Sequence, residues 1–282
     1  MKENLQERIE KAKALLNDAE CVLIGGGAGL SAAAGLTYSG ERFTANFADF
    51  IRKYGMKDMY SAGFYPFETQ EEKWAYWSRH ILLNRFLPPV LPLYKRLYEL
   101  VKGKDHFVLT TNVDGQFYKA GFAPGRIFAV QGDYGKIQCA KGCHDKLYDD
   151  EALVRQMDAE QKNCRVPSYL VPKCPVCGGD MEVNVRKDMY FVQDAAWYEA
   201  GARCDAFCEK ACGRKTVLLE LGVGYNTPTI IRFPFEHMTY ENEGVFLIRM
   251  NADYPEAIEE NAKKTVSFGE DMAEVLPALA EK

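Results

Sequence analysis

Residues 21–36 read CVLIGGGAGLSAAAGL. The short apolar run, the glycines and the alanine-rich end predict a strand, a tight turn and a helix, in that order. Bare backbone amides in such a turn can approach a phosphate at the N-terminus of the helix. The spacing departs from G-x-G-x-x-G, since Leu30 or Ala32 stands in the place of the last glycine, and no acidic residue ends a second strand about twenty residues later. The stretch favours phosphate binding over a plain strand-to-helix turn. It lacks the lysine of a P-loop, which argues against hydrolysis of a nucleotide triphosphate.

Four further apolar runs follow along the chain. They are HFVLTT at 106–111, IFAVQG at 127–132, TVLLELGVG at 216–224 and GVFLIRMNAD at 244–253. Strands that alternate with helices and are almost continuously apolar predict a parallel sheet covered on both faces. Ligands of such sheets bind beyond the carboxyl ends of the strands, where GGGAGLS, TTNVDG and GVGYNTP lie. We therefore predict an α/β fold with a Rossmann-like parallel sheet and a ligand site at this edge.

Helical segments and two inserts complete the predicted domain. Leu5, Ile9, Leu15 and Leu16 fall on one face of an N-terminal helix, and the segments at 195–215 and 272–282 are also expected to be helical. Residues 45–100 are expected to form a helical insert, with a short helix at 45–54 and breaks at Pro66 and at PPVLP, 88–92. Its aromatic stretch, 60–77, forms the core of a small lobe or walls an acceptor channel. The whole chain, 1–282, is taken as one catalytic domain.

Four cysteines in the second insert, 133–190, have the spacing of a metal site. Cys139 and Cys143 form C-x3-C, and Cys174 and Cys177 form C-x2-C about thirty residues later. Four thiolates on two turns suit a closed, structural zinc site, and the alternative is four unrelated buried cysteines. His144 and Cys164 lie close by as spare candidates. Cys204, Cys208 and Cys212 share one helix face, where they are small core residues or metal ligands.

Bulk properties narrow the class of protein. The net charge of −5 and the pI of about 5.6 argue against a nucleic-acid-binding surface. The N-terminus is polar and lacks the apolar core of a signal peptide, and no run of about eighteen apolar residues predicts a membrane span. We therefore expect a cytoplasmic protein in which the nine cysteines are reduced.

Taken together, these motifs resemble the sirtuins from about residue 20 to the C-terminus. The similar stretches are GAGLSAAAGL at 27–36, TTNVD at 110–114, QG at 131–132 followed by Cys139, the zinc cysteines, GVG at 222–224, RMNAD at 249–253 and EVLPAL at 274–279. The resemblance implies that NAD binds between the sheet and a smaller lobe formed by the zinc-ribbon and helical inserts.

The resemblance also implies the site residues. It assigns NAD binding to Gly27, Ala28, Gly29, Ser31, Thr111, Asn112, Asp114, Gln131, Gly222, Val223, Gly224, Asn226, Arg249, Asn251 and Met272. Catalysis is assigned to Asn112, Asp114 and Gln131. From the pattern alone, Asn112 is also compatible with a turn former and Asp114 with a helix cap.

Three departures from the family pattern matter for function. TYSG at 37–40 replaces the usual P-D-F-R, and Arg42 and Phe43 follow two positions late as candidate substitutes. Phe117 replaces a histidine of the N-I-D-x-L-H stretch. Gln131 replaces the catalytic histidine, which implies loss of the general base for sirtuin deacylation. Such a base typically contributes about 10²–10⁴-fold to the rate, whereas an amide only donates and accepts hydrogen bonds.

Loss of the base favours a different reaction of NAD, in which the ADP-ribose is transferred to a protein. Nicotinamide can leave without it, and a nucleophilic acceptor can then capture the ribose. The pattern resembles the macrodomain-linked, class M sirtuins, which implies an NAD-dependent protein mono-ADP-ribosyltransferase. It also implies a lipoylated carrier protein, related to the glycine-cleavage H protein, as acceptor, and a functional macrodomain partner that removes the mark. The alternatives are a protein deacylase that tolerates Gln131 and a non-catalytic NAD or ADP-ribose-binding module.

Overall fold

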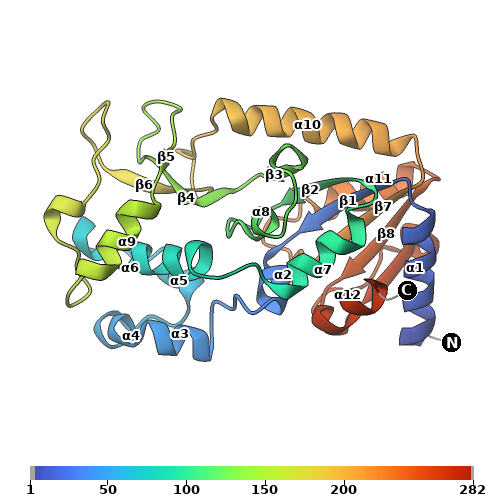
Figure 1. Cartoon of the computed structure of the whole chain (residues 1–282), viewed down its shortest axis with the longest axis horizontal. Helices are drawn as coiled ribbons and strands as arrows, with labels where there is room; N and C mark the ends of the chain where they lie inside the picture. Colours follow the sequence, from blue (N-terminus) through green and yellow to red (C-terminus); the bar gives the residue numbers. More distant parts are fainter. Residues whose placement is uncertain (1–3, 281–282) are drawn as a thin grey trace.

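The larger part of the molecule is built on a parallel sheet of six strands, shown in the right half of Figure 1. The computed structural model describes residues 4–280. The strands lie in the order β3-β2-β1-β7-β8-β9, and their bounds are β1 Cys21–Gly26, β2 Asp105–Thr110, β3 Ile127–Ala129, β7 Thr216–Leu221, β8 Val245–Met250 and β9 Thr265–Phe268. The predicted α/β fold with a parallel sheet is confirmed. β9 has no counterpart among the predicted strands, because its four residues are too few to establish a period.

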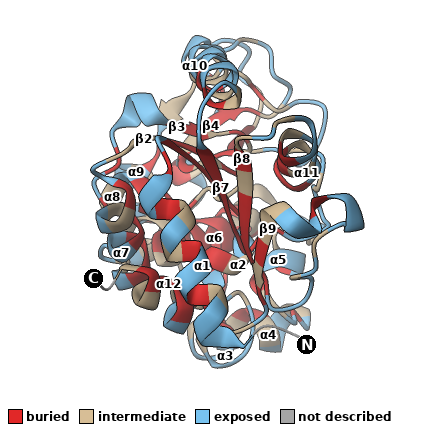
Figure 2. Cartoon of the chain, turned by 90° about the vertical axis from the view of Figure 1, so that its right-hand side faces the viewer, coloured by how far each residue is buried: buried red, intermediate tan, exposed pale blue. Residues whose placement is uncertain are grey.

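Both faces of this sheet are covered, which explains why its strands are apolar at successive positions. In β1, Val22 and Ile24 pack into one core cluster, while Cys21 and Leu23 pack into another. The first face carries α1 Leu5–Asp18, α2 Ala28–Ala33, α7 Pro92–Val101 and α12 Met272–Ala280. The second carries α10 Ala195–Cys212 and α11 Arg232–Glu241. Figure 2 shows the strands as buried elements between these layers.

The N-terminal and C-terminal helices lie in the predicted segments, and one residue of the predicted apolar face differs in burial. α1 begins at a capping box in which the Asn4 side chain accepts from the Glu7 backbone N–H at 2.9 Å and the Glu7 carboxylate accepts from the Asn4 N–H at 3.0 Å. Ile9 and Leu16 are buried and Leu15 is partly buried, as expected, but Leu5, in the first turn, is exposed. Residues 281–282 of the predicted closing segment lie outside the described residues. α11 was not predicted.

The two inserts contribute to a single hydrophobic core in the left half of Figure 1. Its members come from residues 43–82 and from residues 134–183. The elements are α3 Glu41–Asn46, α4 Ala48–Tyr54, α5 Met59–Ala62, α6 Gln70–Ile81, the π-helical turn Leu82–Phe86, β4 Gly132–Cys139, β5 Tyr148–Asp149, α9 Glu151–Glu160 and β6 Met181–Val185. The helix expected at 45–54 is interrupted at Phe47, a fully buried residue that ends α3 and precedes α4. The predicted breaks at Pro66 and before Pro92 are confirmed.

The aromatic stretch of the first insert divides between core and surface. Trp74 and Tyr76 are fully buried, whereas Tyr60 and Phe64 are exposed. The shorter elements of the molecule are α8 Gln116–Lys119 and the 3-10 turns Pro124–Arg126, Ser168–Leu170 and Glu259–Lys264. Between residues 4 and 280, no helix combines the length and the apolar character needed to cross a membrane.

A buried carboxyl group without a partner lies where β5 meets α9. Asp150 is fully buried, and neither of its carboxyl oxygens accepts a hydrogen bond from the described residues. Burial raises the pKa of Asp150 to about 8, and the nearby Asp133 adds to the rise. A protonated carboxyl group therefore occupies this position at neutral pH.

This pKa predicts how stability depends on pH. An unfolded aspartate has a pKa of about 3.9, so the folded state binds the extra proton, and its contribution to stability is lost as the pH rises from about 4 to 8. The isosteric Asp150→Asn variant should therefore lose less stability than the wild type between pH 6 and pH 8. Urea unfolding at pH 6, 7 and 8 measures the difference. Parallel profiles for the two proteins would contradict the assignment.

Candidate active site

The residues implied by the sequence gather at the carboxyl edge of the sheet. Gln131 follows β3, Thr111–Asp114 follow β2, and Gly27–Ser31 follow β1. Gly222–Asn226 follow β7, and Asn251 follows β8. Because β3, β2, β1, β7 and β8 are consecutive neighbours, these segments form one continuous row across the sheet.

Two glycine turns meet backbone to backbone in the middle of this row. The Gly29 N–H donates to the carbonyl of Gly222 at 2.9 Å, and the Gly27 N–H donates to Leu221 at the same distance. A Cβ on Gly27 would lie 2.5 Å from the Gly222 oxygen, and one on Gly29 would lie 2.7 Å from the Gly222 Cα. Gly222 itself has a φ of +61°. Glycine is therefore required here by the contact between the turns, whatever else the turns bind.

Next to the first turn, polar side chains form a continuous chain of hydrogen bonds. Asn112 Nδ2 donates to the Gly27 carbonyl at 2.9 Å and to the hydroxyl of Tyr94 at 3.2 Å. Ser31 Oγ donates to Asp114 Oδ2 at 2.5 Å, so its lone pair is left to accept from the Tyr94 hydroxyl at 2.9 Å. The network fixes Asn112 and Asp114 relative to the glycine turn.

Asp114 lies deep within this arrangement. It is only 4% exposed, and its other oxygen accepts from the Gln116 backbone N–H at 2.9 Å, as a residue that shapes the following turn does. Burial raises the pKa of Asp114, while the Ser31 hydrogen bond opposes the rise. Asp114 therefore combines turn formation with a position in the candidate site.

Arg85 and Asp133 form an ion pair next to this network, and the sequence does not indicate it. Arg85 Nε and Nη2 donate to the two oxygens of Asp133 at 2.7 and 3.1 Å. The guanidinium lies against Gly115, where a Cβ would approach its Cζ to 2.3 Å. Tyr94 was also missed, because an aromatic residue on the buried face of α7 is indistinguishable from core in the sequence.

Gln131 lies half-buried between the two parts of the molecule. Its Nε2 donates to Thr227 Oγ1 at 3.4 Å, in the loop after β7. Its backbone oxygen accepts from the Arg186 N–H at 3.0 Å, just after β6 of the small lobe. Gln131 thus joins the glycine-rich loop at 222–227 to the zinc-ribbon insert. Apart from its position in GVGYNTP, nothing in the sequence indicated Thr227 as a residue of the site.

The residues at the two other positions where the sequence departs from the family pattern contact other residues of the fold. Arg42 donates to the Thr37 carbonyl and to Asn84 Oδ1, both at 2.9 Å, and so attaches α3 to the π-helical turn. Phe43 is buried in the small-lobe core. Phe117 packs edge-to-face on the Tyr94 ring, with ring centroids 5.0 Å apart.

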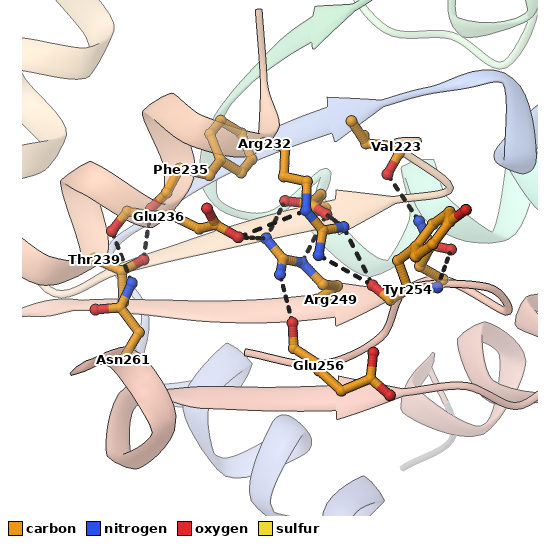
Figure 3. Close-up of polar contacts among 11 residues, drawn as sticks. Val223, Arg232, Phe235, Glu236, Thr239, Arg249, Tyr254, Glu256 and Asn261 are labelled. Carbon is orange, nitrogen blue, oxygen red and sulfur yellow. Dashed lines mark hydrogen bonds and ion pairs between the residues drawn. The ribbon is translucent and has the colours of Figure 1, made fainter. Parts of the chain in front are cut away.

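The structure corrects the expectation for Arg249. Figure 3 shows its guanidinium in a network of ion pairs and hydrogen bonds that includes Glu236 and Glu256, and the side chain is fully buried. It donates to both oxygens of Glu220 at 2.8 and 3.0 Å, to Glu236 at 2.8 Å and to the Glu256 carbonyl at 2.8 Å. Arg232 adds a second cation, 3.6 Å from Glu220. Because Arg249 is fully buried and its donors are occupied within the protein, its role is structural.

Two other expected cofactor residues also have internal contacts. Asn251 Nδ2 donates to the Val223 carbonyl at 2.8 Å, and its oxygen accepts from the backbone N–H groups of Asp253 and Tyr254 at 3.0 Å. Asn251 therefore fixes the loop after β8 to the turn after β7. The Met272 side chain packs in the sheet–helix core.

The four predicted zinc ligands come together at the far end of the small lobe. The Sγ atoms of Cys139, Cys143, Cys174 and Cys177 all lie within 4.8 Å of one another. Cys139 and Cys177 are 3.7 Å apart, and Cys143 and Cys174 are 3.6 Å apart. A tetrahedral ion with Zn–S bonds of about 2.3 Å requires sulfur separations of about 3.8 Å. The cluster therefore fits a closed structural zinc site.

The other candidate ligands lie outside this cluster. His144 Nδ1 is 3.2 Å from Cys143 Sγ, but its other nitrogen contacts the Tyr148 hydroxyl at 2.9 Å. Cys164 is buried in the small-lobe core. Among the described residues, the helix cysteines at 204, 208 and 212 form no group that could hold a metal, and Cys204 packs against the sheet.

Comparison with known proteins assigns the family. A model of the Sir2 family matches residues 27–210, more than half of the chain.

The chain belongs to the Sir2 family.

Curated relatives and a solved structure agree with this assignment. The chain is 38% identical over 279 residues to a protein ADP-ribosyltransferase of Staphylococcus aureus, covering 96% of this chain and 88% of that one. It is 33% identical to a probable bifunctional ADP-ribose hydrolase/ADP-ribosyltransferase of Fusarium oxysporum f. sp. cubense, covering 98% of this chain and 48% of that protein. This Sir2 chain thus spans about half the length of the fungal relative. A crystal structure of a Sir2 homologue–NAD complex has the same fold, with a TM-score of 0.58, 16% identity and coverage of 96% and 92%.

The zinc assignment predicts the effect of removing a ligand from this Sir2 chain. Cys174→Ser and Cys177→Ser should each lose most of the bound metal and become less soluble, because three thiolates cannot close the tetrahedral site. Metal analysis of the purified variants by mass spectrometry measures the loss. Cys212→Ser, which changes a cysteine outside the cluster, should retain the metal. Unchanged metal content in the first two variants would reject the ligand set.

The buried ion network predicts a large cost for a single truncation. Arg249→Leu should lower the free energy of unfolding by about 3–5 kcal/mol, because it leaves the Glu220 carboxylate buried without its main partner. Arg155→Ala, which removes an exposed pair with Glu151, should cost less than about 1 kcal/mol. Urea unfolding of both variants provides the comparison. Equal losses of unfolding free energy would show that the buried network contributes no more to stability than the exposed pair.

Proposed function

We propose that this Sir2 family chain is an NAD-dependent protein mono-ADP-ribosyltransferase. The observation that carries the proposal is Gln131, a neutral amide at the edge position where the family has its general base, just after the strand next to an intact network of Asn112, Tyr94, Ser31 and Asp114. Support also comes from the Staphylococcus aureus relative, which is named a protein ADP-ribosyltransferase and is 38% identical over most of both chains.

The proposed donor site follows the row of turns across the sheet. Gly27, Ala28 and Gly29 would face the pyrophosphate of NAD, and the turn at Gly222–Gly224 would complete that side. Asn226 and Asn251 are proposed for the distal ribose, with Thr111 beside the glycine turn. When bound, NAD supplies an activated ribose whose nicotinamide is the leaving group. The network around Asn112 and Asp114 holds these side chains in place before the donor binds, so little ordering is required at that stage.

Gln131 determines which second substrate this site can use. An amide can orient a ribose hydroxyl by hydrogen bonding, and the contact with Thr227 positions it for this at the boundary of the two lobes. It cannot accept a proton as imidazole does, so an acceptor that must be activated by a base would react slowly. A carboxylate or thiolate acceptor is already nucleophilic and does not need the base. This chemistry favours transfer to a protein side chain over deacylation.

We further propose a lipoylated carrier protein, similar to the glycine-cleavage H protein, as the acceptor. A macrodomain protein that removes the ADP-ribose is the proposed functional partner. The name of the fungal relative, which combines an ADP-ribose hydrolase with an ADP-ribosyltransferase, supports the pairing of the two opposing activities.

The proposal predicts a graded response in one assay. Labelled NAD and a lipoylated carrier protein should give a labelled carrier with the wild type. Asn112→Ala should lower the rate by about 10²-fold or more, because it removes a fixed amide from the site and releases the Gly27 turn and Tyr94 that the amide holds. Gln131→Ala should lower it by about 10-fold, the loss of one hydrogen bond. Gln156→Ala, a change of an exposed glutamine on α9, serves as the control.

Two results would count against the transferase. One is an unlabelled carrier although NAD binding is measured by calorimetry, which would favour a binding module. The other is release of acyl-ADP-ribose from an acylated peptide by the wild type, which would favour a deacylase. Gln131→His should gain that release if the rest of the site is intact, since imidazole restores a proton acceptor.

A further inference from the structure

The connector between the small lobe and α10 runs past Gln131. It comprises residues 186–194, between the end of β6 and the start of α10 (Figure 1). At its first residue, the Arg186 N–H donates to the Gln131 carbonyl at 3.0 Å. Just beyond its last residue, in the first turn of α10, Trp197 Nε1 donates to the Val130 carbonyl at 3.1 Å. Both ends of the connector are therefore hydrogen-bonded to the backbone around Gln131.

The side chain of Gln131 does little to fix its own position. Within residues 4–280, its amide makes one hydrogen bond, to Thr227 Oγ1 at 3.4 Å, which is longer than the typical range of about 2.7–3.2 Å. The backbone is held more firmly, because the Val130 N–H also donates to the Thr110 carbonyl at 3.0 Å. The orientation of the Gln131 amide therefore depends on where the backbone of residues 130–132 lies.

Two buried amides hold the middle of the connector. Gln138 on β4 and Asn184 on β6 are each 3% exposed. The Val192 N–H donates to Gln138 Oε1 at 2.9 Å, and Gln138 Nε2 donates to the Tyr190 carbonyl at 2.7 Å. Asn184 Nδ2 donates to Gln138 Oε1 at 2.7 Å and to the Val192 carbonyl at 3.1 Å. The two side chains thus bind both backbone polar groups of Val192 and the carbonyl of Tyr190.

These hydrogen bonds fix the orientation of both amides. A backbone N–H only donates, so the Gln138 atom that faces Val192 is its oxygen, and its nitrogen then faces the Tyr190 carbonyl. Asn184 meets two acceptors, and it can serve both only through its nitrogen. A leucine at position 184 has a similar size and shape but no donor, so it would remove both of these buried bonds.

Asn184 also contacts the residue that follows Gln131. A Cβ on Gly132 would lie 2.0 Å from the Asn184 carbonyl oxygen and 3.0 Å from its side-chain oxygen. Gly132 has a φ of +100°, so glycine is required for this approach. Gly132 pairs with Val185, and the β4–β6 ladder shifts its register between Gly132 and Ile137. Asn184 therefore joins the middle of the connector to the Gln131 segment.

We propose that the connector sets the position of Gln131, with Asn184 and Trp197 as its positioning residues. The inference rests on the proposed transferase, because the step that Gln131 serves belongs to that function. A misplacement of about 1 Å at a reacting site can lower a rate by about 10²-fold, so a loosened backbone at residues 130–132 is enough to affect transfer. Since Asn184 and Trp197 act through Gln131, the loss on removing either is limited to the contribution of Gln131 itself.

A double-mutant cycle separates positioning from general stability. Asn184→Leu should lower the initial rate of carrier labelling by about 10-fold, the loss also expected for Gln131→Ala. In the protein with both changes the loss should remain about 10-fold, since the two changes act on the same group. A combined loss of about 100-fold, or a wild-type rate for Asn184→Leu, would overturn the proposal.

Asn261→Leu is the matched control for a buried amide. Asn261 is 1% exposed, and its Nδ2 donates to the Glu236 carbonyl at 2.8 Å, in the 3-10 turn before β9. This change should lower the free energy of unfolding but leave the labelling rate unchanged at a temperature where all variants are folded. Equal losses of rate in Asn261→Leu and Asn184→Leu would show a general effect of lower stability and contradict the positioning role.

Hydrogen exchange tests the same inference without NAD or an acceptor. In Asn184→Leu, the amides of Arg186 and Val192 should exchange about 10-fold faster, because their segment has lost two hydrogen bonds. Asn261→Leu should leave both amides unchanged. An unlabelled carrier with the wild type would reject the transferase, and this measurement then decides by itself whether Asn184 holds the connector. Unchanged exchange at Arg186 would refute the inference in either case.

Trp197→Phe provides a second route if Asn184→Leu folds poorly. Phenylalanine retains an aromatic ring against Phe128, whose centroid lies 5.0 Å from that of Trp197, and removes the N–H bound to the Val130 carbonyl. Trp197→Phe should lower the labelling rate by about 5-fold, the loss of one hydrogen bond, and should lower it no further in the Gln131→Ala background. The same 5-fold loss in that background would mean that Trp197 acts independently of Gln131, which contradicts the proposal.

Discussion

The contact on which the rest of the site depends is the backbone approach of the turn at Gly27–Gly29 to the turn at Gly222. No side chain fits between them, since a Cβ on any of these glycines would lie within 3 Å of the opposing backbone. This contact joins the ends of β1 and β7, the two central strands of the sheet. From there the Asn112 amide holds the β2 end to Gly27, and Asn251 holds the β8 end to Val223. A strict steric requirement at one point therefore sets the geometry of the whole row.

Charge is distributed in this molecule so that the candidate site itself is almost neutral. Two ion pairs lie to either side: the fully buried pair of Arg249 with Glu220, next to Glu236 of α11, and the partly buried pair of Arg85 with Asp133, beside Gly115. Between them, the polar groups that face the row are amides and hydroxyls, together with one deeply buried carboxyl, Asp114. In a region of low dielectric, an added imidazolium would strongly perturb such a network. Gln131 keeps the edge uncharged, which is consistent with a site that positions its substrates and leaves nucleophilicity to the acceptor.

The sequence predicts those features that depend on local pattern, and it fails for contacts between distant segments. The strands, the four metal-binding cysteines and the clustering of Asn112 with the glycine turn follow from apolar period, spacing and the rule for parallel sheets. Tyr94 and Arg85 were not predictable, because their roles arise from partners 63 and 48 residues away. Arg249 was misassigned since its position in RMNAD does not reveal that Glu220 lies on the neighbouring strand. α11 was missed where the chain after GVGYNTP resembles a loop.

The shared core of the two inserts has a consequence for synthesis of the protein. Residues 43–82 carry much of the aromatic surface of the small lobe, but the residues that cover it extend to position 183. β1 likewise has one neighbour by residue 110 and gains the other only at residues 216–221. The ribosome synthesises the chain from the N-terminus. The apolar surfaces of the aromatic helices and of β1 therefore stay partly uncovered until most of the chain has been made. The interval before closure is when this protein is most exposed to aggregation, and the second cysteine pair, at residues 174 and 177, is synthesised late in it.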